Sequence, residues 1–369
     1  MRNFRLVTVT EDKLRFIWEV HAYLESVKQI GWEHKVDVVI FKPATKSEYD
    51  KRWEIVAKNY PFAKFYFYQD EKIEDSHTLA PLIPIYGSII RPYALMKHFN
   101  RYPDLEKEAI IYTDTDILFT KKPDIEKLIE DEINYVSDTV SVNDYMSHKY
   151  FESKRNDVDP KLLEEYDKRD IIEELARIVQ IDKSVITENI SNTGGVQYIL
   201  KNINSDFWYK VMMDCIHIKV HLMNINQHFF PGVTTEERES KGFQSWCADL
   251  WATLWNLWYH QATVRCAPEL EFAWATDKIE KLSERPNISI LHNAGVTSTE
   301  TMIIREGKLV IDAPAFYKGR REYCDNLKTP FTDLEYLQSV VANETSQKYC
   351  TYLYTMHLLD LQQKQKLIY

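Results

Sequence analysis

The sequence predicts an α/β fold in which a mixed sheet is flanked by helices. In the first third of the chain, short apolar runs alternate with amphipathic segments, as expected for strands connected by helices. A later apolar run contains a pair of aspartates, which is typical of a strand that ends at a binding site. With 369 residues, the chain can bury about three quarters of its unfolded surface, so a large core is available.

Three strands are predicted in the first third, at 6–9, 36–41 and 65–68. Thr10 is expected to cap a helix whose first turn holds Glu11 and Asp12. The apolar stripe expected along that helix consists of Leu14, Ile17, His21, Leu24 and Val27. A second helix, rich in Lys and Glu, is expected between the second and third strands. This βαβαβ order predicts parallel strands with right-handed crossovers.

The most informative residues are Asp114 and Asp116, in the apolar run 109–119, which we interpret as one buried strand. Burying two carboxylates side by side is costly unless a cation or hydrogen-bond donors compensate them. We therefore expect a metal ion here. Because ligands of such sheets bind at the carboxyl ends of strands, Thr10 and the aspartates are expected to line one crevice.

Arg91 and Pro92 are predicted to open a helix that runs to about residue 99, with the proline at the first helical position. Two interpretations of Arg91 stay open. It is either a surface arginine that pairs with a nearby acid, or a donor to a phosphate or a sugar hydroxyl.

The segment 143–189 is charged and helical in pattern, and we interpret it as a helical insertion, either a lid or only a solvated face. The sequence Ser191–Asn192–Thr193–Gly194–Gly195 follows and precedes a strand predicted at 196–200. Paired glycines allow a tight turn or a close approach of the backbone to a ligand.

The segment 243–258 is apolar on nearly every face, which predicts a buried helix. Asp249 is the exception in that helix. A buried carboxylate needs partners, so Asp249 is either a functional residue or an aspartate that backbone amides satisfy.

His292 follows the last predicted strand, 288–291, and begins the sequence His292–Asn293–Ala294–Gly295. His292 is either a structural histidine or, because it lies at a strand end, a ligand that could reach the ion that the aspartates imply. Two carboxylates and one imidazole suit manganese better than magnesium.

In this order, the motifs resemble those of the retaining glycosyltransferases of the glycogenin and lipopolysaccharide galactosyltransferase family. The resemblance spans residues 1 to about 296, and its motifs are Val9–Thr10, Arg91, Asp114–Thr115–Asp116, Asn192–Thr193–Gly194, Gln244 with Asp249, and His292 to Gly295. Members of this family have the GT-A fold, a Rossmann-like domain that binds nucleotide-sugars. The chain departs from the family pattern in lacking a lysine soon after Gly295, where Lys318 is the nearest comparable one, and in the four residues between Gln244 and Asp249.

The resemblance implies transfer of a sugar from a nucleotide-diphosphate sugar, a UDP-sugar above all, to a glycan or other small acceptor with retention at the anomeric carbon. Asp114, Asp116 and His292 would hold the metal. Val9 and Thr10 would bind the base, Asp114 could also meet the ribose, and Lys318 or Arg91 would add positive charge near the phosphates. Asp249, Asn192 and Gln244 would contact the donor sugar.

The composition of the chain excludes some classes of partner and location. The net charge of −10 argues against nucleic acid as a partner, and the chain has no run of about 18 apolar residues that could span a membrane. Five cysteines without C-x-x-C spacing suggest a reducing compartment, so we expect a cytoplasmic protein; the oligomeric state is left open. We divide the chain into a glycosyltransferase domain, 1–330, and a helical C-terminal extension, 331–369. A phosphohydrolase of the HAD type and a non-catalytic carbohydrate- or protein-binding module are the rival functions.

Overall fold

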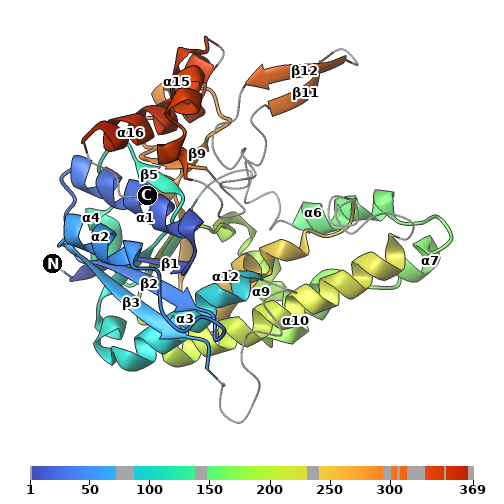
Figure 1. Ribbon diagram of the computed structural model, residues 1–369. Helices are drawn as coiled ribbons and strands as arrows, with labels where there is room; N and C mark the ends of the chain where they lie inside the picture. The colour runs from blue at the N-terminus through green and yellow to red at the C-terminus, as the bar shows by residue number, and fades with distance from the viewer. Residues whose placement is uncertain are drawn as a thin grey trace. The chain divides into compact units, whose positions relative to one another are not determined.

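The computed structural model describes residues 2–71, 87–137, 148–230, 241–293, 301–305, 308–313, 329–344 and 346–364. Figure 1 shows helices and strands in the mixed α/β arrangement that the sequence predicts. The chain forms two compact units that interleave along the sequence. Unit 1 consists of Met1–Phe4, Asp70–Ile111 and Glu126–Ala267, and unit 2 of Arg5–Gln69, Tyr112–Ile125 and Pro268–Tyr369.

In unit 2, three parallel strands stand in the order β3-β2-β1, which confirms the parallel arrangement predicted for the first third. They are β1 (Phe4–Glu11), β2 (Val36–Lys42) and β3 (Ala63–Gln69), connected by helices α1 (Leu14–Gln29) and α2 (Arg52–Asn59). Residues 6–10 of β1 are all buried, as expected for a parallel strand covered on both faces.

The predicted helix cap at Thr10 is wrong. Thr10 pairs with Ile40 and Glu11 with Phe41 in the parallel ladder, so both residues belong to β1. Helix α1 begins only at Leu14, after Lys13 in extended conformation. The predicted stripe is otherwise confirmed, because Ile17, His21, Leu24 and Val27 are buried; Leu14 is only half-buried.

The run 109–119, predicted as one strand, is in fact two. Strand β4 (Ala109–Tyr112) ends before the aspartates, and β5 (Ile117–Phe119) begins after them in a different sheet. The second sheet has the order β5-β10-β9, with β9 (Phe272–Trp274) and β10 (Ile290–His292). Strand β5 is antiparallel to β10, whereas β9 is parallel to it. Asp114 and Asp116 therefore lie in the turn between two strands.

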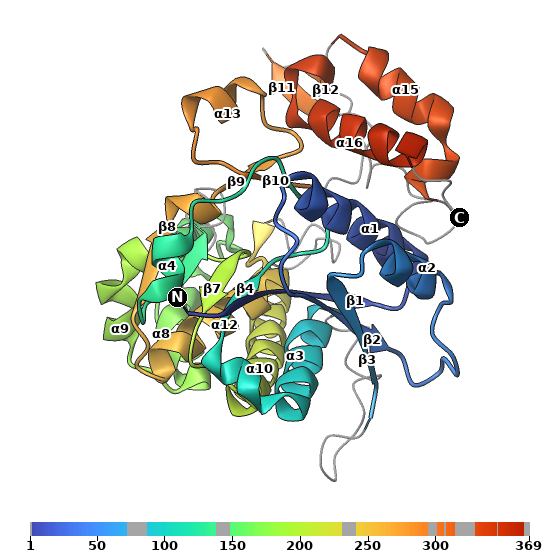
Figure 2. The same cartoon turned by 90° about the vertical axis from the view of Figure 1, so that its left-hand side faces the viewer.

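The C-terminal segment of unit 2 is helical, as predicted, with α15 (Leu334–Ala342) and α16 (Cys350–Lys364). Figure 2 shows α15 and α16 side by side, with α16 next to α1. His357 of α16 contacts the carbonyl oxygen of Ala22 through Nε2 at 3.0 Å, and Gln29 donates to Asp360 at 3.0 Å. The C-terminal helices thus pack on the core of unit 2. The remaining elements of unit 2 are α13 (Glu280–Glu284), the antiparallel pair β11 (Thr301–Arg305) and β12 (Lys308–Ala313), and the 3-10 turns η6 (Pro268–Leu270), η7 (Pro330–Thr332) and η8 (Ser346–Lys348).

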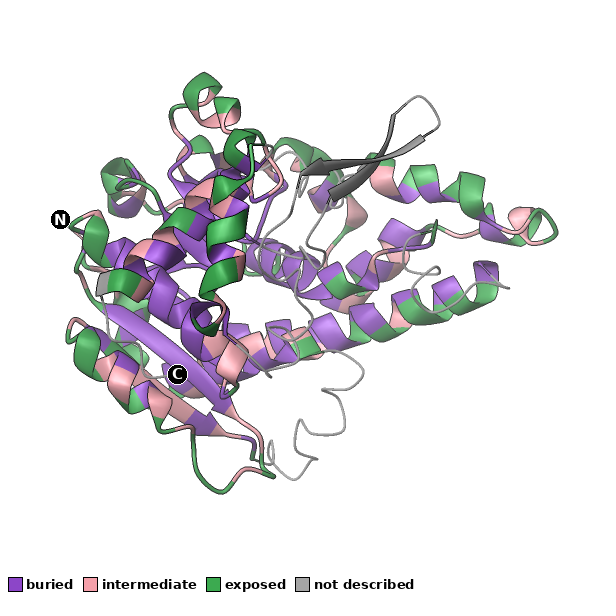
Figure 3. Ribbon diagram, turned by 45° about the horizontal axis from the view of Figure 1, so that its top comes forward, coloured by how far each residue is buried: buried purple, intermediate pink, exposed green. Residues whose placement is uncertain are grey.

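Unit 1 contains strands in the order β4-β7-β6-β8, where β6 (Asn134–Ser137) is antiparallel to β7 (Tyr198–Leu200) and parallel to β8 (Val264–Ala267). Its main helices are α3 (Ile90–Arg101), α10 (Ser205–Phe229) and α12 (Ala248–Tyr259), and α10 packs against the other two. In Figure 3, α10 carries both buried and exposed residues along its length. Residues 248–258 of α12 are all buried, which confirms the predicted buried helix.

Two predictions in unit 1 need small corrections. Helix α3 begins at Ile90, after the 3-10 turn η1 (Gly87–Ile89), so Pro92 is not its first residue. Proline is still tolerated there, because the first four N–H groups of a helix have no partner within it. Strand β7 begins at Tyr198 rather than at 196, since Val196 has a left-handed φ of 77° that breaks the strand.

The segment predicted as a helical insertion is a series of short helices in its described part, from residue 148 on. They are α6 (His148–Ser153), η3 (Lys154–Asp157), α7 (Leu163–Tyr166), α8 (Ile171–Val179) and α9 (Lys183–Glu188), and the 3-10 turn η4 (Ile190–Asn192) follows the segment. The other short elements of unit 1 are η2 (Pro103–Lys107), α4 (Glu126–Glu130) and η5 (Ser245–Cys247). Among the described residues, no helix has the length and apolar character needed to cross a membrane.

Candidate functional site

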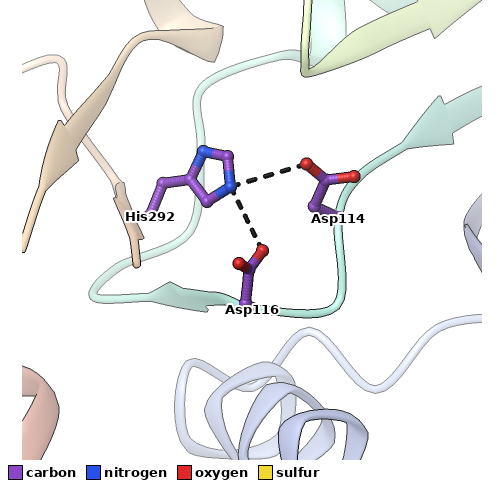
Figure 4. A group of neighbouring side chains, drawn as sticks. All are labelled: Asp114, Asp116 and His292. Atoms are coloured by element: carbon purple, nitrogen blue, oxygen red, sulfur yellow. Dashed lines mark hydrogen bonds and ion pairs between the residues drawn. The ribbon is translucent and has the colours of Figure 1, made fainter. Parts of the chain in front are cut away.

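The structure brings together the three residues predicted to bind a metal. Nε2 of His292 lies 3.1 Å from Oδ1 of Asp116 and 3.5 Å from Oδ2 of Asp114, as Figure 4 shows. The ligand atoms of all three residues lie within 4.8 Å of one another. His292 is the last residue of β10, and the aspartates come from the turn before β5, the strand that pairs with β10. The convergence of three residues up to 178 positions apart follows from this strand pair.

The backbone fixes the turn on both sides. The N–H of Thr113 donates to the carbonyl oxygen of Val7 in β1 at 3.1 Å, so the turn starts beside the first strand. The N–H of Asn293 donates to the carbonyl oxygen of Asp116 at 3.1 Å, which continues the β5–β10 pairing by one residue. The aspartates are thus held between two strands of unit 2.

Aromatic rings surround the imidazole of His292. The ring of Trp274 is stacked on it with centroids 5.2 Å apart, and Phe272 meets it edge-on at 4.9 Å. His292 is 2% exposed, and Nδ1 is buried without a hydrogen-bond partner among the residues that the structure describes. The rings therefore fix the plane of the imidazole and point Nε2 at the two carboxylates.

The pKa of His292 is set by opposing effects. Burial lowers it, but the charge of Asp116, the hydrogen bonds to Asp114 and Asp116, and the charge of Asp114 together outweigh burial and raise it above its ordinary value. A proton on Nε2 would occupy the place that a divalent cation would take between the same carboxylate oxygens. Two carboxylates and an imidazole are suitable ligands for a divalent ion such as Mn²⁺, so the residues present fit the metal that the sequence predicts.

Proton and metal are expected to compete for Nε2 of His292, because only the neutral ring binds a cation. Since the pKa of His292 is raised, the proton persists to higher pH than on a free imidazole. We expect the Mn²⁺ affinity to be independent of pH above this raised pKa and to fall about tenfold per pH unit below it. Calorimetric titration of Mn²⁺ from pH 6 to 9 in buffers of different ionisation enthalpy measures both the affinity and the proton released. An affinity that is flat across the range, with no proton release, would contradict ligation by His292.

The predicted base-binding residues, Val9 and Thr10, lie in unit 2 near the carboxyl end of β1, the strand that Thr113 contacts. Both are nearly buried, at 6% and 4% exposure. The hydroxyl of Thr10 has no hydrogen-bond partner among the described residues. The strands that carry Thr10 and the aspartate turn are therefore neighbours, as the predicted crevice requires.

Asp12, which was predicted only as a first-turn residue of the helix, instead organises the loop after β2. This carboxylate is 2% exposed and accepts hydrogen bonds from Nε1 of Trp53 at 2.8 Å and from the N–H of Asp50 at 3.1 Å. Nζ of Lys46 lies 2.6 Å from its other oxygen. Asp12 thus ties the end of β1 to the residues between β2 and α2.

In unit 1, Asp249 and Arg91 are partners. Arg91 in the first turn of α3 lies 3.2 Å from Asp249 in the first turn of α12, measured from a guanidinium nitrogen to Oδ2. The Asp249 side chain is 10% exposed, and that of Arg91 is 34% exposed. Both were candidates, but the sequence did not predict that they pair. The guanidinium of Arg91 and the positive end of α12 both compensate the negative charge of this buried side chain.

The other sequence candidates have less defined roles. Asn192 lies in η4 and donates its backbone N–H to Asn189 at 2.8 Å, and Gln244 donates its backbone N–H to the hydroxyl of Tyr150 at 2.6 Å. Their predicted contacts with a donor sugar stay predictions. Lys318 and Gly295 lie outside the residues that the structure describes.

Comparisons with known proteins give similarity at the level of structure alone. A scan against protein-family models found no match, and a search of curated proteins found no similar sequence. Among solved structures, the chain is similar to the bifunctional glycosyltransferase WbbM, with a TM-score of 0.45, 12% identity, and coverage of 91% of this chain and 51% of the WbbM chain. It therefore spans about half the length of that protein.

The chain is also similar to the galactosyltransferase LgtC in complex with donor and acceptor sugar analogues, with a TM-score of 0.35 and 10% identity over 80% of this chain and 89% of LgtC. For an active-site mutant of LgtC, the TM-score is 0.38 and the identity 10%, over 87% of this chain and 94% of the other. Similarity at this level does not decide the chemistry, which depends on the side chains described above.

Proposed function

We propose that this protein is a metal-dependent glycosyltransferase that moves a sugar from a nucleotide-diphosphate sugar to a glycan or other small acceptor. The donor in this proposal is a UDP-sugar, and the sugar is transferred with retention at the anomeric carbon. One observation carries the proposal: Asp114, Asp116 and His292 present three ligand atoms within 4.8 Å of one another at the ends of two paired strands.

The chemistry of sugar transfer explains why such a cluster is needed. The bond from the anomeric carbon to the diphosphate breaks, and negative charge builds up on the leaving oxygen. A divalent ion, Mn²⁺ in this proposal, would stabilise that charge as a Lewis acid and fix the diphosphate in place. Asp114, Asp116 and His292 would hold the ion and leave its remaining positions open for phosphate oxygens. Carboxylates alone would repel the diphosphate, so the cluster favours this substrate only with its cation.

The remaining candidates have roles that follow from their chemistry. In this proposal, Val9 and Thr10 contact the base, and Asp114 also accepts a hydrogen bond from the ribose. Arg91 or Lys318 adds positive charge near the phosphates.

Asp249 accepts hydrogen bonds from hydroxyls of the donor sugar or places negative charge beside the oxocarbenium-like centre, and Asn192 and Gln244 shape the sugar pocket. Its ion pair with Arg91 gives this carboxylate a partner of opposite charge within an apolar helix.

Nucleotide titration tests the proposal. We expect UDP to bind in the presence of MnCl₂ and to lose at least about tenfold in affinity when EDTA replaces the metal, because the diphosphate would contact the ion directly. A screen of UDP- and GDP-sugars for Mn²⁺-dependent hydrolysis then identifies the donor. Binding of UDP that does not change on metal removal would count against the proposal. Hydrolysis of simple phosphate esters would favour the phosphohydrolase, and binding of glycans without any nucleotide would favour the binding module.

A further inference from the structure

The turn that carries the aspartates presents its side chains alternately in two directions. Asp114 and Asp116 point toward His292, as Figure 4 shows. Thr113 and Thr115 instead contact helix α1. The hydroxyl of Thr113 donates to the hydroxyl of Tyr23 at 3.3 Å, and that of Thr115 donates to Oε2 of Glu19 at 2.9 Å. Helix α1 therefore contacts the turn on the side opposite to the imidazole.

Glu19 is an unusual residue for this position. It is 1% exposed, and removing a carboxylate from water is costly unless hydrogen bonds and an opposite charge compensate it. Its two oxygens have different partners. Oε1 accepts a hydrogen bond from Nε of Arg15, one turn earlier on the same helix, at 2.8 Å. Oε2 accepts the hydrogen bond from Thr115, the residue between the two aspartates.

The surroundings of Glu19 show that this contact is enclosed. Tyr354 of α16 is 1% exposed, and burial, followed by the charges of Glu19 and Asp116, raises the pKa of its hydroxyl well above the ordinary value. Tyr354 lies in the same buried core cluster as Trp18 and Ala22 of α1. Helix α16 packs against α1, and both Glu19 and Thr115 are buried, at 1% and 5% exposure, so water cannot replace the bond between them at low cost.

We propose that Glu19 is a positioning residue that acts through Thr115 to hold Asp114 and Asp116 in the geometry that binds the metal. This inference rests on the proposed function, because it concerns the affinity of the same metal site. A hydrogen bond to the central residue of the turn limits its rotation, and so fixes the separation of the two carboxylates on either side. Outer partners of this kind typically change metal affinity by about 10- to 100-fold when they are removed.

Thr115→Val is the sharpest test, because valine has nearly the shape of threonine and lacks only the hydroxyl. The substitution leaves Glu19 and its ion pair with Arg15 unaltered, so no charged residue near the metal site is added or removed. We expect the Mn²⁺ affinity, measured by calorimetry on the full chain, to fall about tenfold or more in this variant. Thr115→Ser restores a hydroxyl and is expected to bind Mn²⁺ within about twofold of the wild type, since its donor to Glu19 is kept.

Ser26→Ala is the matched control. Ser26 also lies on α1, and its Oγ accepts a hydrogen bond from the N–H of Phe119 at 3.1 Å, beyond the aspartates. Replacing Ser26 by alanine removes this hydrogen bond between α1 and β5 but none of the hydrogen bonds of Thr113 and Thr115. The Mn²⁺ affinity of Ser26→Ala is therefore expected to stay unchanged. Thermal unfolding in EDTA separates a loss of stability from a loss of metal binding in all three variants.

The outcomes are distinct. Wild-type affinity in Thr115→Val, or an equal loss in Ser26→Ala, would overturn the positioning role and leave the metal site intact. Failure of the wild-type protein to bind Mn²⁺ would overturn the proposed function and this inference with it.

Discussion

Asp116→Asn is expected to reduce Mn²⁺-dependent sugar transfer or donor hydrolysis roughly 1,000-fold, the equivalent of about 4 kcal/mol of transition-state stabilisation. Asparagine has the shape of aspartate but carries no charge, so the remaining ligands would hold a divalent ion much more weakly. The nearest oxygen of Asp116 lies 3.1 Å from Nε2 of His292, so the substitution acts at the centre of the cluster. Initial rates at saturating donor, together with calorimetric Mn²⁺ titration, measure the loss.

A control must separate the loss of a ligand from the loss of a buried charge. Asp37 serves this purpose, because it lies in the same unit, is 1% exposed, and pairs with Arg5 at 2.9 Å. Asp37→Asn is expected to lower the unfolding temperature while leaving the Mn²⁺ affinity unchanged. If Asp116→Asn keeps the wild-type affinity for Mn²⁺, the aspartates are not the metal ligands.

The grouping of Asp114, Asp116 and His292 could be predicted from the sequence because its signals are local. Each of the three residues lies at the end of an apolar run, and buried carboxylates require a cation or hydrogen-bond donors to compensate them. The pairing of β5 with β10, which brings the three residues together, could not be predicted from the sequence. Strand β5 pairs with β10 from more than 160 residues away, and this long-range pairing is what divides the run 109–119 into two strands. A pattern of apolar residues alone cannot show that the chain changes sheets.

Thr10 illustrates a local signal that long-range pairing overrides. Threonine followed by two acidic residues is a good start for a helix, and the sequence predicts one there. In the structure, the ladder with β2 continues through Glu11, and its backbone hydrogen bonds outweigh the cap. Helix propensity near a strand end is therefore a weak guide to where the helix begins.

Glu19 shows why a functional candidate can be missed. In an amphipathic helix, a glutamate is expected on the solvent side, and the sequence offers no reason to look further. Helix α1 is instead buried on every face from Ile17 to Val27, because it contacts both β5 and the C-terminal helix α16. The burial of Glu19 can be recognised only when it is known that α16 also covers α1. Helix α16 comes from a segment more than 300 residues later in the sequence.

The second large effect is expected for Asp249→Asn, which should lower turnover by about 100- to 1,000-fold if this carboxylate contacts the donor sugar or the charge that develops on it. The alternative is that Asp249 serves only to pair with Arg91, 158 positions away in sequence and 3.2 Å away in space. Asp214→Asn is the matched control within the same unit. Asp214 is 5% exposed and accepts hydrogen bonds from Lys210 at 2.7 Å and from Asn256 at 2.9 Å. The Asp214→Asn variant is expected to be less stable than the wild type and to have an unchanged kcat.

Arg91→Met separates the two roles of Asp249. If the carboxylate acts only through Arg91, removing either partner breaks the same ion pair, and the two variants should lose the same factor in kcat/KM. If Asp249 acts on the sugar, Asp249→Asn should lose kcat by a larger factor than Arg91→Met, and the double variant should be no better than Asp249→Asn alone. Equal losses in the two single variants, with no further loss in the double variant, would show that Asp249 and Arg91 act as one ion pair, and a separate contact of Asp249 with the sugar would not be supported.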